Sequence, residues 1–110
     1  MTAFNAQTER EGDVATIRFE GELDLTTARD ADAAIQRMED EGATSLIVDL
    51  RGLRFMDSTG LRVIVSADSR ARRAGRHVRL IPGPEAVHRV FRIALLDQRL
   101  EFIQPDGAAP

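Results

Sequence analysis

Apolar and polar side chains alternate in two short stretches at the start of the chain. Residues 4–8 and 14–19 each show a period of two, which is typical of strands with one face on a core. Glu11-Gly12-Asp13 lies between these stretches and provides turn-forming residues. The pattern therefore predicts an antiparallel hairpin whose inner face packs on the core.

Helical periodicity replaces this alternation after residue 27. Small and apolar side chains recur every three or four residues at Ala28, Ala31, Ile35 and Met38. This spacing predicts a helix with one face on the sheet, and Gly42 is expected to end it. Residues 20–25 are predicted to be the loop into this helix, with Asp24 or Thr26 as its cap.

A nearly continuous apolar run, residues 46–50, follows that helix. Such a run is typical of a strand covered on both faces, and Arg51-Gly52 is predicted to turn the chain after it. Asp57-Ser58-Thr59-Gly60 then precedes helical periodicity that ends near Gly75. We therefore expect Ser58 at a helix start, where backbone N–H groups carry partial positive charge and would favour a phosphate.

The rest of the chain continues the same order of elements. A short strand is predicted at 78–81, and Pro82-Gly83-Pro84 separates it from a third helix with Val87 and Phe91 on its buried face. Residues 100–103 are predicted to form a last edge strand. Residues 1–104 are expected to be one domain, and residues 105–110 a disordered tail.

Strands that alternate with helices indicate an α/β fold with parallel strand pairs. The expected architecture is a mixed β-sheet opened by an antiparallel hairpin, with helices following the second, third and fourth strands. The strand before Ser58, the 58–74 helix and the 77–81 strand are expected to form one crossover unit.

Composition narrows the chemistry that the chain can carry. The 110 residues are 43% apolar and 30% charged, as in ordinary globular domains. No apolar run approaches the roughly 20 residues of a membrane span, and residues 1–5 lack the features of a secretory signal. The absence of cysteine excludes disulfides and thiolate chemistry, and the absence of lysine excludes a lysine-dependent phosphate loop. We expect a cytoplasmic protein without a cofactor or metal.

Charge is distributed unevenly between the two halves. Residues 1–50 carry four arginines and twelve acidic residues, whereas residues 51–110 carry eleven arginines and six acidic residues. This polarity could steer a partner, or it could reflect arginines on the solvent faces of the later helices. The net charge of −3 and the lack of aromatic residues among the arginines argue against direct nucleic-acid binding.

Three segments together resemble the STAS domain of bacterial anti-sigma factor antagonists: residues 21–25 (Gly-Glu-Leu-Asp-Leu), residues 46–50 (Leu-Ile-Val-Asp-Leu) and residues 55–61 (Phe-Met-Asp-Ser-Thr-Gly-Leu). The resemblance extends from about residue 5 to residue 103. One departure is that Leu95 stands where the family often has glycine. Leucine does not readily adopt the left-handed conformation of a glycine cap, so the geometry after the third helix is in question.

The resemblance implies a regulatory switch and not an enzyme. In this family an anti-sigma factor, often a serine kinase, phosphorylates the serine at the position of Ser58. The unphosphorylated antagonist binds the anti-sigma factor and so releases the sigma factor, and a serine/threonine phosphatase restores that form. The expected partners are therefore these two proteins, with no membrane partner.

The site predicted on this basis centres on Ser58 as the phosphorylated residue. The partner is expected to bind a surface made by the following residues: Asp24, Asp57, Ser58, Thr59, Gly60 and Arg62. Asp57 and Ser58 could alternatively be plain helix caps, Thr59 is a rival phosphate acceptor, and Asp24 could simply cap a helix. Asp49 is expected to have a structural hydrogen-bonding role.

Two other functions keep some support. A scaffold or nucleotide-sensing module could use the same fold without a phosphorylation cycle. A small enzyme is a weaker alternative, because His77 and His88 lack the neighbouring hydroxyl, carboxylate or metal-ligand spacing that catalysis needs.

Overall fold

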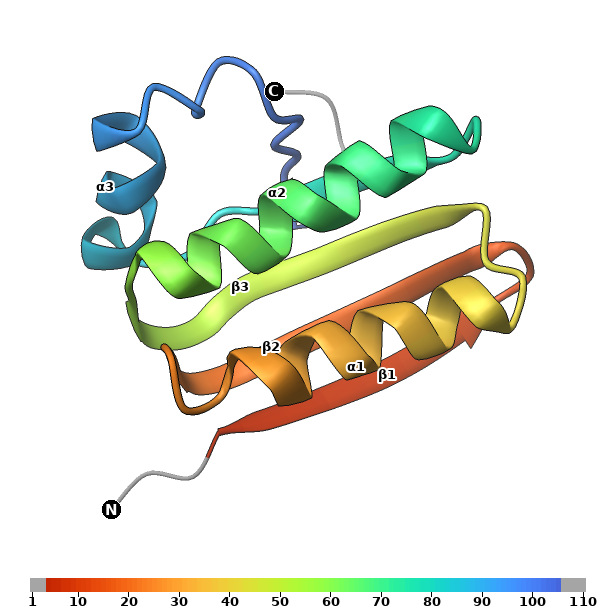
Figure 1. Ribbon diagram of the computed structural model, residues 1–110, viewed down its shortest axis with the longest axis horizontal. Coiled ribbons are helices and arrows are strands. Elements are labelled where there is room, and N and C mark those ends of the chain that lie inside the picture. The colour runs from red at the N-terminus through yellow and green to blue at the C-terminus, as the bar shows by residue number, and fades with distance from the viewer. Residues whose placement is uncertain (1–3, 106–110) are drawn as a thin grey trace.

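Residues 4–105, described here by a computed structural model, form two layers: a four-stranded sheet with α1 and α2 side by side across one face (Figure 1). The elements in chain order are β1 (Asn5–Glu11), β2 (Val14–Leu23), α1 (Ala28–Asp40), β3 (Ser45–Met56), α2 (Ser58–Arg73), β4 (His77–Ile81) and α3 (Glu85–Ile93).

The strands occur in the order β1-β2-β3-β4 across the sheet. β1 pairs with β2 antiparallel, whereas β2 with β3 and β3 with β4 are parallel pairs. α1 joins the first parallel pair and α2 joins the second, and α3 follows β4. The predicted α/β fold, a mixed sheet opened by a hairpin, is confirmed.

The core lies between the sheet and the two long helices. Ile17, Phe19 and Val48 of the strands are fully buried, and small side chains such as Ala31 and Ala67 bring the helices close to them. Burial of this apolar surface stabilises the fold. Because β2, β3 and β4 run parallel, their carboxyl ends lie at one edge of the sheet, on the left in Figure 1.

Two segments predicted as a loop and a turn belong to strands instead. β2 continues through Glu20–Leu23, and β3 runs through Arg51-Gly52 to Met56. The pairing is irregular here, with register shifts after Arg18 and after Gly21. Gly52 is required by this close pairing, because a Cβ there would lie 2.8 Å from the Phe19 carbonyl oxygen. A glycine that looks like a turn residue thus marks a close approach of two strands.

The two faces of β3 differ, contrary to the prediction that both are covered. Leu46, Val48 and Leu50 are buried, whereas Ser45 and Ile47 are only half-buried. The predicted edge strand at residues 100–103 is likewise reduced to a single parallel bridge between Leu80 and Phe102.

Leu95 adopts the left-handed conformation that its sequence argued against, with φ of 60°. The Leu95 N–H donates to the Arg92 carbonyl at 3.0 Å, and the Leu96 N–H donates to the Phe91 carbonyl at 2.8 Å. These two bonds are the Schellman pattern that ends many helices. The helix end therefore has the geometry of a glycine cap, although leucine occupies the position.

None of the helices in the described residues is long and apolar enough to cross a membrane. Of the predicted tail, residues 106–110 lie outside the described part of the chain.

Candidate functional site

Asp57 begins α2 by capping it. The residue has an extended backbone, and its Oδ1 accepts hydrogen bonds from the Thr59 N–H at 2.9 Å and the Gly60 N–H at 3.1 Å. Two of the N–H groups that a helix start leaves unpaired are thereby satisfied. Of the two residues considered as caps, Asp57 has this role and Ser58 is the first helical residue.

The start of α2 is also anchored to the end of β2. The Asp57 N–H donates to the Leu23 carbonyl at 3.2 Å. Gly60 is buried, and a Cβ at this position would lie 2.7 Å from Leu23 Cγ and 2.8 Å from Met56 Cγ. The first turn of α2 therefore depends on glycine for close packing, which places Gly60 beneath the predicted surface.

Ser58 is exposed on this anchored turn. Its neighbours Asp57 and Thr59 are half-buried, so Ser58 is the more exposed of the two hydroxyl residues that follow the cap. α2 carries no acidic side chain within its first turn. The site thus presents a neutral hydroxyl at the partially positive end of a sixteen-residue helix.

Asp24 shapes the turn between β2 and α1. Its Oδ1 accepts hydrogen bonds from the Thr26 N–H at 2.9 Å and the Thr26 hydroxyl at 2.7 Å. The hydrogen bond from the Thr26 hydroxyl, helped by the backbone N–H groups of Thr26 and Thr27, outweighs the opposing effect of burial and holds the pKa of Asp24 below its ordinary value. Because Leu23 is bonded to Asp57, this turn lies beside the start of α2.

Two exposed apolar side chains near the site were missed in the sequence. Leu25 in the β2–α1 turn is 76% exposed, and Phe55, two residues before Asp57, is 47% exposed. A leucine within an otherwise polar turn was the available signal for the first. The second was hidden because Phe55 and Met56 are adjacent apolar residues, and the sequence does not show that only Met56 is buried.

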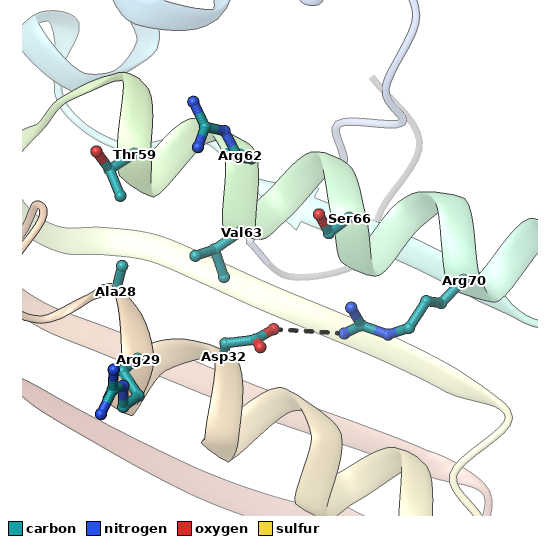
Figure 2. Close-up of a pocket in the computed structure, with 8 residues that line it drawn as sticks. All are labelled: Ala28, Arg29, Asp32, Thr59, Arg62, Val63, Ser66 and Arg70. Carbon is teal, nitrogen blue, oxygen red and sulfur yellow. Dashed lines mark ion pairs between the residues drawn. The ribbon is translucent and has the colours of Figure 1, made fainter.

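A groove between α1 and α2 begins at Thr59 (Figure 2). Its volume is about 360 Å³, and it is open along the surface. Arg62, one turn along α2 from Ser58, is exposed on its upper wall in Figure 2. The lining residues are Ala28, Arg29, Asp32, Thr59, Arg62, Val63, Ser66 and Arg70.

Asp49 is held in place within β3. Its carboxylate accepts two hydrogen bonds from the Arg51 guanidinium, at 3.0 and 2.7 Å, and one from the Arg51 N–H at 3.0 Å. Burial would raise the pKa of Asp49, but the Arg51 contacts and the Arg18 charge outweigh it and lower the pKa below its ordinary value. The predicted structural hydrogen-bonding role is confirmed.

Residues that could carry other chemistry are dispersed. In residues 4–105, no three His, Asp or Glu side chains are grouped so as to hold a metal ion. The His88 ring packs edge-on against Phe102 at 4.8 Å and near Phe91 at 6.0 Å, as part of an aromatic cluster. His77 is exposed at the start of β4.

Comparison with known proteins gives a consistent result. The STAS domain family matches residues 5–106. An anti-sigma-B factor antagonist of Listeria monocytogenes is 30% identical over 99 residues, which cover 90% of this chain and 87% of the relative.

Solved structures show the same fold. The anti-sigma factor antagonist SpoIIAA in its unphosphorylated form aligns with a TM-score of 0.77 and 24% identity, covering 94% of this chain and 90% of that one. The phosphorylated form of Bacillus SpoIIAA aligns with a TM-score of 0.71 and 23% identity, covering 94% of each chain.

Proposed function

Because the chain belongs to the STAS domain family, we propose that it is an anti-sigma factor antagonist whose binding is switched off by phosphorylation of Ser58. The unphosphorylated chain would bind an anti-sigma factor and so release the sigma factor. The observation that carries this proposal is the exposed Ser58 hydroxyl on a first helical turn that is fixed by Asp57 and Gly60.

The proposed binding surface combines polar and apolar groups around Ser58. The polar contacts would come from Asp24, Asp57, Thr59 and Arg62. Gly60 is buried under this surface, where the absence of a side chain lets the turn pack closely against β2. Leu25 and Phe55 extend this surface, because exposed apolar side chains next to a polar site are typical of protein interfaces.

Phosphorylation would oppose binding by adding charge and bulk at the centre of that surface. A phosphate adds about −1.5 to −2 charges, and desolvating it without a matching cation at the interface is expensive. Within the chain, Asp57 already occupies the N–H groups of Thr59 and Gly60. The Ser58 N–H and the Arg62 guanidinium are the groups left to stabilise the phosphate, so little backbone movement is required.

The proposed partners are an anti-sigma factor that is also a serine kinase and a serine/threonine phosphatase that reverses its action. The chain itself would act by binding, without catalysis or a cofactor. The proposed cycle is cytoplasmic, since it regulates transcription.

Copurification from cells of the source organism, with and without added ATP, tests the proposal. The expected result is capture of an anti-sigma factor without ATP, release with ATP, and a phosphate on the tryptic peptide Phe55–Arg62. The Ser58→Ala variant should still capture the anti-sigma factor but gain no phosphate in that peptide. A Ser58→Ala chain that is phosphorylated as fully as the wild type would show that another residue is the acceptor.

A further inference from the structure

The α1–α2 groove reaches from the predicted switch surface along the two helices. Thr59 lines its near end directly beside Ser58, so a protein bound over Ser58 would also meet this opening. Ala28 and Val63 form apolar walls, and Val63 points from α2 towards α1 in Figure 2. The groove has room for a side chain of a bound partner.

Two arginines give the near end of the groove a positive charge. Arg29 of α1 and Arg62 of α2 are exposed, and in Figure 2 they lie on either side of the groove with their guanidinium groups directed away from each other. Across the portion of the chain that the structure covers, neither has a carboxylate within ion-pair distance. Both guanidinium groups are therefore available to an anion from outside the chain.

The arginine at the far end of the groove is already paired within the chain. Arg70 lies 3.1 Å from Glu39 and 3.6 Å from Asp32, so one guanidinium faces two carboxylates. Asp32 also accepts a hydrogen bond from Gln36 at 2.7 Å, which holds its side chain in place. Asp32 and Arg70 line the groove, whereas Glu39 does not. The groove therefore has two arginines beside Ser58 without an acidic partner among the described residues, and a paired arginine at its other end, so an acidic group of an occupant would be bound at the end beside Ser58.

We propose that this groove binds a segment of the anti-sigma factor in which an acidic residue lies next to an apolar side chain. The apolar side chain would lie between Ala28 and Val63, and the carboxylate would be bound by Arg29 or Arg62. This inference rests on the proposed function, and its location follows from the continuity of the groove with Ser58.

Arg62 also connects the groove to the switch. Residues four apart on a helix lie about 5–6 Å apart at their Cβ atoms, so a phosphate on Ser58 would be within reach of the Arg62 guanidinium. The phosphate and the acidic residue of the partner then compete for the same cation. Phosphorylation would weaken the groove contact as well as the contact at Ser58 itself.

Charge reversal at the two arginines tests the inference. The affinity of each variant for the anti-sigma factor, identified by the copurification above, is measured by isothermal titration calorimetry. Arg29→Glu and Arg62→Glu should each weaken binding at least about tenfold, because like charges facing each other at an interface oppose association. Arg73→Glu is the matched control, since Arg73 is exposed on the last turn of α2 and lies outside the groove. It should stay within about twofold of the wild type.

Amide spectra of the wild-type chain provide a second readout that does not depend on a variant folding. Binding of the anti-sigma factor should shift the resonances of Ala28 and Val63 along with that of Ser58. Groove resonances that stay fixed, or reversed arginines that bind within twofold of the wild type, would overturn the groove proposal alone. A wild-type chain that does not bind the anti-sigma factor at all would contradict the proposed function and the groove proposal with it.

Discussion

The start of α2 and the end of α3 differ in how well their residues suit the backbone that they form. At the start of α2, the Asp57 carboxylate accepts hydrogen bonds from two backbone N–H groups. Gly60 allows close packing against Leu23 and Met56 that a side chain would block. At the end of α3, Leu95 has a left-handed backbone with φ of 60°, and its apolar side chain is 77% exposed.

The difference follows from what surrounds each helix end. The first turn of α2 is enclosed by Leu23 and Met56, so one added methyl group has nowhere to go. The end of α3 lies at the surface, where an unfavourable conformation costs energy but creates no clash. Residue choice is therefore tightly constrained beside Ser58 and loosely constrained at Leu95, as expected if the first region must hold a functional group in one place.

The largest effect should come from Gly60→Val. The added side chain would collide with Leu23 and Met56, and overpacking of this kind costs about 3 kcal/mol of unfolding free energy. Urea unfolding measures the loss, and Ser69→Ala on the exposed side of α2 is the control expected to match the wild type. A Gly60→Val chain as stable as the control would mean that the turn is not tightly packed.

Loss of the cap should have a smaller effect. Asp57→Ala leaves the N–H groups of Thr59 and Gly60 without their acceptor, and removing such a cap costs about 1–2 kcal/mol. Thermal unfolding should show a lower midpoint, whereas Asp57→Asn, which keeps an acceptor oxygen, should recover most of the stability. Equal losses in the two variants would indicate that capping is not the role of this side chain.

The end of α3 should respond in the opposite direction. Leu95→Gly removes the steric cost of a left-handed leucine, for a gain of about 1 kcal/mol after the extra chain entropy of glycine is subtracted. Leu95→Ala, which keeps a Cβ, should not give this gain. If Leu95→Gly is no more stable than Leu95→Ala in urea, the strain at this position is negligible.

Ser58 itself should contribute least to stability. Its side chain is exposed and does not cap the helix, so Ser58→Ala should change the unfolding free energy by less than about 0.5 kcal/mol. This result would separate the functional hydroxyl from the residues that support it. A loss comparable to that of Asp57→Ala would instead assign Ser58 a structural role.

The sequence was sufficient to identify most of the elements and the order in which they occur. Helical periodicity located α1 and α2, and the residues around Asp57 marked the start of α2 because capping chemistry is local. The extensions of β2 and β3 could not be predicted in this way. Gly21 and Gly52 resemble turn residues, and only the close pairing of the two strands keeps them within the sheet.

The site was predictable in its centre and not in its surroundings. The motif around Ser58 is continuous in the chain, so its capping and exposure follow from local rules. The exposure of Leu25 and Phe55, and the groove shared by Arg29 and Arg62, depend on how separate elements pack. No local pattern encodes such contacts.

The most direct test of this account is the dissociation constant of the anti-sigma factor for the chain before and after complete phosphorylation at Ser58. The charge added at the centre of a fixed surface should weaken binding by at least about a hundredfold. An affinity that stays within twofold, with mass spectrometry confirming a phosphate on every Ser58, would contradict the account.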